Sequence, residues 1–384
     1  MQPGHLADAA ALMDSARSGA PGAAEGERQA AAILSFLGLL APSGEIRLPP
    51  DERRQFARLL RMAARLDAVF PMRVPTAPGA AFFGARRTHA ANRELAGDGK
   101  ARQSDYAGLA SSLAQAFCAC IGEAAEHDAM FRRRRDIRLS AAGTLPLLDE
   151  GLCAAGGIDA ALILREAGDS PRPAPRSSTG YAAGPTLASA AMGALLECVE
   201  RHAISLWFND LRKPVSVRVS NETVQHITIL RGAAAARCRL LLLPHDIAGA
   251  PVAAAYSVSA GGGMAVGYGC ALSAEQACQK AVRELCQGEF ALHLESQASS
   301  ANALPFTERS RMFAQNTRLF EAGDGDSDNV KRHSDLPSLC AALGRRVRFV
   351  DLSLSKVSVP VVCALVDGVR DIAGEFGPGQ TGPL

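Results

Sequence analysis

Apolar residues recur at helical spacing in several segments of the chain. Residues 51–70 place them at nearly every third or fourth position and open with acidic side chains, which the helix dipole favours at an N-terminus. The segment after Ser273 begins with a suitable N-cap. Further helices are expected over 109–131, 186–208, 274–292 and 336–343.

Short runs typical of β-strands lie after these helical segments, while residues 71–107 combine Pro, Gly and basic side chains and predict loops and short strands. Irregular alternation of helices and short strands predicts an α+β fold with mixed sheets. We expect a mostly helical N-terminal extension over 1–80 and a main domain over 81–384. The expected strands are 237–243, 251–259, 263–269, 346–353 and 359–369.

Composition and charge narrow the function. The chain has 384 residues, 48% hydrophobic and 21% charged, which is ordinary for a globular protein. A formal net charge of +2 argues against a general nucleic-acid-binding protein. No apolar run approaches the roughly 20 residues that a membrane span needs, and the N-terminus lacks a signal-peptide pattern. The ten cysteines form no Cys-x-x-Cys pair, so we expect a cytoplasmic, reduced protein.

Acidic or amide side chains stand three positions apart on three of the predicted helices. This spacing places both members of a pair on one helix face, in surroundings rich in Ala, Leu and Cys. A carboxylate pair on a buried face is costly unless a cation neutralises it. The pairs are Glu123 with Glu126, Glu197 with Glu200 (followed by Arg201), and Glu284 with Gln287.

Two interpretations of these pairs remain open from the residues alone. Mg²⁺ takes carboxylate oxygens and often bridges substrate phosphates, and the guanidinium of Arg201 matches a phosphate. The pairs could therefore form a site for Mg²⁺ and a nucleotide, although the chain contains no P-loop. Pairs of this kind are also common on solvated helices, and for any one helix that interpretation is the more frequent one.

The motifs around these pairs resemble those of the YcaO family. STGYAAGPTLASAAMGALLECVERHAISLWF is similar to its signature loop and Glu-x-x-Glu-Arg helix, and is the most specific of the matches. GLASSLAQAFCACIGEAAEH resembles an earlier motif, and GYGCALSAEQACQKAVRELCQ a later one, in the family's order. LGRRVRFVDLSLSKVSVPVVCALVDGV resembles the closing strands. The resemblance covers about residues 80–375 and implies a YcaO-type fold.

The resemblance implies ATP and Mg²⁺ as cofactors, and it implies roles residue by residue. Arg201 would meet a phosphate, and the residue that acts as general base is not identified. The metal ligands would be Glu123, Glu126, Glu197 and Glu200. The nucleotide would also be lined by Glu284 and Gln287, and approached by the loop residues Ser178 and Thr179.

The activity implied is an ATP-dependent cyclodehydratase. A Cys, Ser or Thr side chain of a precursor peptide attacks the preceding amide carbonyl, and the resulting oxyanion takes the γ-phosphoryl group of ATP. Phosphate then leaves, which gives a thiazoline or oxazoline ring. The implied partners are the precursor peptide and a separate protein that binds its leader, and a homodimer is also expected. Neither a nucleic acid nor a membrane is expected as a partner.

The motifs depart from the family's pattern at several positions. His127 replaces an arginine, Thr179 replaces an asparagine, the loop before the first helix lacks a lysine, and the tail carries few prolines. His127 and His202 adjoin the motifs, but histidines on helix flanks are more often structural. The alternatives left open are a thioamide- or amidine-forming enzyme and a subunit that serves only as a scaffold.

Overall fold

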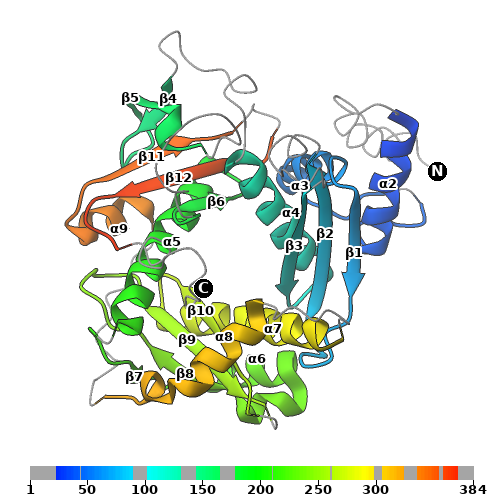
Figure 1. Cartoon of the computed structure of the whole chain (residues 1–384). Coiled ribbons are helices and arrows are strands. Elements are labelled where there is room, and N and C mark those ends of the chain that lie inside the picture. The colour runs from blue at the N-terminus through cyan, green and yellow to red at the C-terminus, as the bar shows by residue number, and fades with distance from the viewer. Residues whose placement is uncertain are drawn as a thin grey trace.

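Three antiparallel sheets and a set of helices build the protein, as a computed structural model shows (Figure 1). The structure describes residues 23–43, 45–89, 102–130, 144–164, 178–209, 211–259, 262–297, 305–323, 335–353 and 358–370. Within these ranges, no helix has the length and apolar content that crossing a membrane requires. The predicted α+β class is confirmed.

Neighbouring strands run antiparallel in every sheet. The first sheet has the order β1 (Ala68–Met72), β2 (Ala81–His89), β3 (Arg102–Ala110). The second has the order β5 (Ala154–Asp159), β4 (Thr144–Leu148), β11 (Val347–Asp351), β12 (Val361–Val366), β6 (Tyr181–Ala183). The third has the order β10 (Met264–Cys270), β9 (Val252–Val258), β8 (Arg239–Leu242), β7 (Val215–Ser216).

Each sheet carries one long helix on the side that faces the other two sheets (Figure 1). The three helices are α4 (Leu113–Met130), α5 (Leu187–Phe208) and α7 (Ala274–Gln297). They pack against β3, against β6 and β12, and against β10, respectively. The other helices are α2 (Ala23–Phe36), α3 (Pro50–Ala63), α6 (Asn221–Arg231), α8 (Pro305–Gln315) and α9 (Leu336–Leu343).

The three long helices begin in the same way, at a hydroxyl side chain. Backbone N–H groups of the first helical turn donate to Ser112, Thr186 and Ser273, at 3.3, 3.1 and 3.3 Å. The N-cap predicted at Ser273 is therefore confirmed. These caps fix the register with which each helix enters the centre of the molecule.

Glycines let the helices lie directly on the strand backbones. A Cβ atom added at Gly267 of β10 would come within 2.0 Å of Leu285 N and 2.4 Å of Ala281 O of α7. At Gly108 of β3 it would come within 2.2 Å of Ala116 O of α4. Real Cβ atoms do not approach backbone so closely, so only glycine fits at these positions.

Sequence and structure differ most in the first sheet. The helix expected over 51–70 ends at Ala63, and β1 follows, because Pro71 favours an extended conformation for the residue before it. Residues 71–107, expected to form loops and short strands, contain the nine-residue strand β2 and the start of β3. Arg86 and Arg87 lie on β2, and Arg86 faces Asp105 across the strands, 2.7 Å away.

The boundary expected at residue 80 stays a prediction. Strand β1 lies before residue 80 and pairs along its whole length with β2, which lies after it. Helices α2 and α3 share a hydrophobic core with α4, including Leu34, Phe56 and Phe117. Two helices that the sequence did not predict, α6 and α8, lie against α7.

The close contact of α7 with β10 is testable by a matched pair of glycine substitutions. Gly267→Ala should lower the free energy of unfolding by about 1–3 kcal/mol, because a methyl group would overlap the α7 backbone. Gly288→Ala, in α7 itself, meets nothing closer than 3.6 Å and should raise stability by up to about 1 kcal/mol. Urea unfolding of both variants checks this, and equal stability of the two would contradict it.

Candidate functional site

A strand–cap–helix unit occurs three times around the centre of the molecule. Each unit has a buried tyrosine on or beside its strand: Tyr106, Tyr181 or Tyr268. The capping hydroxyl follows it in the chain, and the first glutamate of an acidic pair comes later on the helix. The recurrence therefore extends beyond the acidic pairs that the sequence analysis noted.

The first glutamate of each pair accepts a hydrogen bond from the strand of its own unit. Glu123 Oε2 accepts the N–H of Ala107 at 2.8 Å, and Glu284 Oε2 accepts that of Tyr268 at 3.2 Å. Glu197 Oε2 accepts the N–H of Gly180, at the start of β6, at 3.1 Å. Each helix is thus attached to its strand at the same point.

The second glutamate reaches the strand of the next unit. Glu126 Oε1 of α4 accepts the N–H of Ala183 in β6 at 2.7 Å. Glu200 Oε2 of α5 accepts the N–H of Cys270 in β10 at 2.8 Å. The third helix, α7, has Gln287 at this position and packs against β3 of the first unit. The five carboxylates thereby meet where the three sheets adjoin.

Two cationic side chains lie among these carboxylates. Arg201 Nη2 is 3.3 Å from Glu197 Oε1, one turn earlier on α5. Lys280 Nζ of α7 is 3.0 Å from Glu200 Oε2. The sequence analysis missed Lys280, although it lies one turn before Glu284 on the same helix face. Glu200 is buried, with 3% of its side chain exposed.

The pKa values show how this crowding of charge is distributed. Burial raises the pKa of Glu126 to about 8, although the Ala183 N–H opposes the rise, and the charges of Glu197 and Glu123 add to it. Burial likewise raises the pKa of Glu284 to about 7 and that of Glu197. For Glu200, burial is outweighed by Lys280 and Arg201, which lower its pKa.

Glu123 differs in being open to solvent on one side. The protein packed around its carboxyl nevertheless raises its pKa to about 7. For Arg201, burial alone would lower the pKa, but the charges of Glu197 and Glu200 outweigh it and raise the pKa. The guanidinium is therefore fully charged, as a phosphate-binding group must be.

The loop before β6 completes this side of the cluster. Ser178 is exposed and Thr179 is half-buried, directly before Gly180. Gly180 has a positive φ of 83°, and a Cβ atom there would lie 2.8 Å from both Ala364 O and Cys198 Sγ. Only glycine can therefore present this N–H to Glu197. Gln287 lies one turn beyond Glu284, outside the polar contacts described above.

A mostly apolar pocket of about 540 Å³ adjoins the cluster. Helices α3 and α4 form its walls with the segments 183–185 and 359–360. It includes Ala183, whose N–H bonds Glu126, and Gly122, which precedes Glu123. Apolar side chains such as Phe56 and Leu59 line it beside the polar Arg58, whose Nη1 donates to Pro185 O at 3.4 Å.

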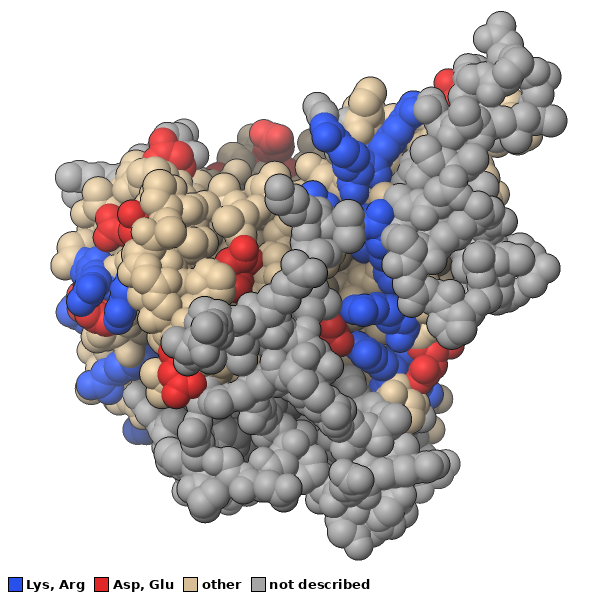
Figure 2. Space-filling model, turned by 90° about the horizontal axis from the view of Figure 1, so that it is seen from above, with Lys and Arg blue, Asp and Glu red and all other residues tan. Residues whose placement is uncertain are grey.

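Basic side chains gather in a strip on the face seen from above in Figure 2. Helix α3, which lies at the top of Figure 1, carries arginines at spacings of three and four residues, so they share one side of the helix. They are Arg54, Arg58 and Arg61, and Arg65 follows just beyond the end of the helix. Arg58 lines the pocket together with Glu52 of the same helix, so the α3 side of the pocket carries charges of both signs.

A comparison with protein-family models gives a match over residues 157–370, to the family described as YcaO cyclodehydratase, ATP- and Mg²⁺-binding. The chain belongs to the YcaO family. The matched segment contains the second and third units. It excludes α4, the helix of the first unit, although that helix carries the earlier of the motifs that resemble those of the family. No curated protein matches the chain in sequence.

Solved structures share the fold of this YcaO protein. YcaO from Methanopyrus kandleri, bound with AMPPCP and Mg²⁺, has a TM-score of 0.64 and 21% identity over 88% of this chain and 96% of that one. A heterocyclase in complex with substrate and cofactor has a TM-score of 0.66 and 18% identity over 86% of this chain. The chain spans 53% of that heterocyclase.

The E. coli microcin synthetase McbBCD complex contains a further chain with this fold, with a TM-score of 0.53 and 13% identity over 78% of this chain and 86% of that one. At these identities the likeness concerns the fold alone. The family's description names ATP and Mg²⁺, so the two predicted cofactors are confirmed at the level of the family.

The residues of this YcaO chain fit Mg²⁺ and a polyphosphate. Five carboxylates face two cations, and Glu123, Glu126 and Glu284 have no ion pair within the described ranges. In that part of the chain, no three His, Cys, Asp or Glu side chains converge as ligands of one ion. Mg²⁺ does not require such a cage, because it commonly binds one or two carboxylates together with phosphates and water.

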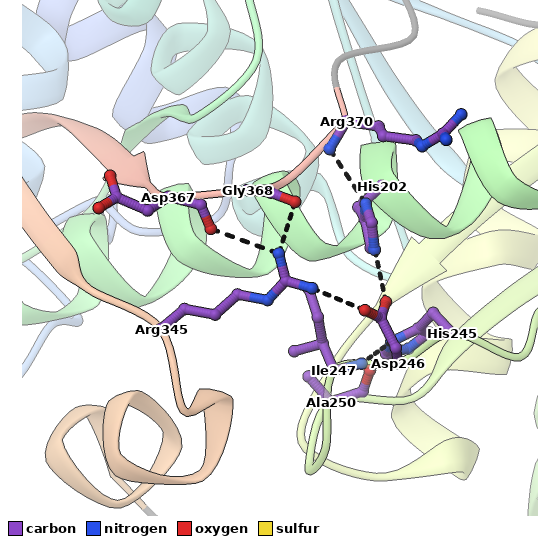
Figure 3. Close-up of polar contacts among 9 residues, drawn as sticks. All are labelled: His202, His245, Asp246, Ile247, Ala250, Arg345, Asp367, Gly368 and Arg370. Atoms are coloured by element: carbon purple, nitrogen blue, oxygen red, sulfur yellow. Dashed lines mark hydrogen bonds and ion pairs between the residues drawn. The ribbon is translucent and has the colours of Figure 1, made fainter.

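The two histidines beside the motifs are held by other protein groups. His127 Nδ1 is 3.1 Å from the hydroxyl of Tyr106. Buried His202 accepts the N–H of Arg370 at Nδ1, at 3.0 Å, so Nε2 carries the proton and donates to Asp246 Oδ1 at 2.7 Å (Figure 3). Both ring nitrogens of His202 are engaged, so its role is structural.

Asp246 joins three segments that are distant in sequence. Besides His202 of α5, it accepts from Arg345 Nη2 at 2.7 Å, and Arg345 Nη1 donates to the carbonyls of Asp367 and Gly368, at 3.3 and 2.5 Å (Figure 3). The end of β12 is thereby fastened to α5, next to Glu200 and Arg201. No local pattern pointed to Asp246, because its partners His202 and Arg345 lie 44 and 99 positions away in the chain.

Removing the carboxylate of Asp246 tests this junction. Asp246→Ala leaves the buried Nε2–H of His202 without its acceptor, so the free energy of unfolding should fall by about 1–2 kcal/mol. Asp105→Ala, which breaks the exposed pair with Arg86, is the control and should cost less than about 1 kcal/mol. Urea unfolding measures both. A larger loss in the Asp105 variant would contradict the assignment.

The raised pKa of Glu126 predicts a pH dependence of stability in metal-free buffer. With a folded pKa of about 8 against an ordinary value of 4.5, the folded chain binds more protons than the unfolded chain between these values. The free energy of unfolding should therefore fall as pH rises from about 4.5 to about 8. Glu126→Gln should reduce this fall.

The control for the pH experiment is Glu321→Gln, at an exposed position, which should leave the decline unchanged. Both variants are compared with the unmodified chain by urea unfolding at pH 5.5 and pH 8 in the presence of a chelator. An identical decline in the unmodified chain and in Glu126→Gln would show that this carboxyl does not titrate as described.

Proposed function

We propose that this YcaO protein is an ATP-dependent cyclodehydratase that converts backbone amides of a ribosomally made precursor peptide into thiazoline or oxazoline rings. The observation that carries the proposal is the cluster of five carboxylates and Arg201 beside an apolar pocket. A charged cluster beside an apolar pocket suits a ligand with a flat apolar base at one end and a metal-bound polyphosphate at the other.

The nucleotide is assigned to the pocket and the adjoining cluster. The base would occupy the apolar space between α3 and α4, and Arg58 and Arg201 would supply positive charge for the phosphates. The residues expected to line the nucleotide on the other side are Glu284, Gln287, Ser178 and Thr179. These assignments rest on the positions of the residues in the motifs and on the hydrogen bond that the Gly180 N–H donates to Glu197.

Divalent ions are assigned to the carboxylates of the first two units, Glu123, Glu126, Glu197 and Glu200. Two of these, Glu123 and Glu126, have only backbone N–H donors as partners in the described ranges, so their oxygens are available to a cation, whose charge would favour the ionised form of both. When bound, ATP and Mg²⁺ supply the phosphoryl group and the positive charge that turn an amide oxygen into a leaving group.

The chain's own residues would bind and orient the reactants. Arg201 holds a full positive charge close to the carboxylates, where it can stabilise charge that develops on a transferred phosphoryl group. The thiol or hydroxyl that attacks belongs to the peptide. His202 is not a candidate for general base, because both of its nitrogens are bonded within the protein.

The proposed partners are the precursor peptide and a separate protein that binds the leader segment of that peptide. Support comes from the related structures, which include a heterocyclase with substrate and the multi-subunit McbBCD complex. A homodimer of this chain is part of the same proposal.

Co-expression with a candidate precursor peptide and the neighbouring genes tests the proposed activity. Mass spectrometry should detect the loss of one water for each modified Cys, Ser or Thr. Glu197→Gln should abolish that loss, whereas Glu308→Gln, an exposed position on α8, should preserve it.

Other mass changes would point to the alternatives. Exchange of oxygen for sulfur would identify a thioamide-forming enzyme and overturn ring formation. No change with the partner protein and ATP present, together with no ATP hydrolysis, would favour a scaffold subunit.

A further inference from the structure

One buried carboxylate of the cluster already has a cation. Oε2 of Glu200 lies 3.0 Å from Lys280 Nζ and also accepts the N–H of Cys270 at 2.8 Å. Only 3% of the Glu200 side chain is exposed. A single oxygen therefore receives both a charged and a neutral donor in a place where water has little access.

Lys280 is specific to the third unit. It stands four residues before Glu284, the first glutamate of its helix. The positions four residues before Glu123 and Glu197 hold Ala119 and Gly193. Ala119 lines the pocket, and the small residues at these two positions leave the first two helices without a cation at the equivalent place.

Charge is consequently unequal around the centre. Helix α5 has a cation for each of its carboxylates, since Arg201 pairs with Glu197 and Lys280 with Glu200. Within the described ranges, Glu123 and Glu126 of α4 have no ion pair. A divalent cation therefore meets no competing protein cation at the α4 carboxylates, whereas at Glu200 it would have to approach an ammonium group.

We propose that Lys280 is a built-in cation that takes the place of a divalent ion at Glu200, so that metal binds on the α4 side of the cluster. The inference rests on the proposed nucleotide and metal site. It replaces one assignment made from the motif positions: Glu200, given there as a metal ligand, would instead position α7 and Lys280 without ligating metal. A Mg²⁺–carboxylate contact needs about 2.0–2.1 Å, and an ammonium group 3.0 Å from the same oxygen repels an ion placed there.

Counting bound Mn²⁺ ions tests this proposal directly. The full chain without nucleotide is titrated with Mn²⁺, and free Mn²⁺ is followed by electron paramagnetic resonance. Lys280→Met should bind one more Mn²⁺ per chain than the unmodified protein, because Glu200 loses its cation. Lys280→Arg keeps the charge and should bind the unmodified number. An equal number of ions with equal affinity in Lys280→Met and the unmodified chain would overturn the proposal.

Two further variants protect the test from a folding failure. Glu200→Gln/Lys280→Met removes both charges and should return to the unmodified number of ions. Lys280→Gln replaces the ammonium with a neutral group that can still donate to Glu200, and it should gain one ion if Lys280→Met does not fold. Circular dichroism confirms folding of each variant.

The ion count is independent of peptide modification. A gain of one ion in Lys280→Met with no mass change in any peptide would support this inference and count against cyclodehydration. Water loss from the peptide with no gain of an ion in Lys280→Met would support cyclodehydration and overturn this inference.

Discussion

A carboxylate on a helix that accepts a backbone N–H from a strand is the interaction on which the centre of this protein depends. Three glutamates attach their own strands, and two more, Glu126 and Glu200, attach the strand of the next unit. The second kind links sheets that share no strand. When the acceptor is ionised, such a bond is stronger than a neutral one, but it brings a negative charge into the interior.

The same arrangement explains the unusual packing around the site. A glutamate side chain reaches the strand backbone only if its helix lies very close, and glycines such as Gly108 and Gly267 allow this. The proximity crowds carboxylates together and raises their pKa values, as for Glu126. Packing and electrostatics are thus consequences of one geometric requirement.

The acidic pairs could be predicted because each lies within one helix, where a spacing of three residues fixes a shared face. The helices and most strands after residue 230 followed from local patterns for the same reason. Lys280 and Asp246 could not be predicted, since their partners, Glu200 and His202, are 80 and 44 positions away in sequence. The length of β2 was not predicted, because the Pro, Gly and basic residues of 71–107 suggested loops and short strands; in the sheet Arg86 pairs with Asp105 on the neighbouring strand.

Repetition of one unit makes the differences between the copies informative. The residue after the second acidic or amide side chain is His127, Arg201 or Gly288, and the second side chain itself is Glu126, Glu200 or Gln287. Backbone geometry is shared, so the side chains set the difference in charge: within the described ranges the carboxylates of the first unit have no ion pair, those of the second are paired, and the third supplies Lys280. A polyphosphate bound at such a centre would meet the unpaired carboxylates, with any metal on them, on one side and protein cations on the other. That difference would give a nucleotide one preferred orientation, which a symmetric ring of carboxylates would not provide.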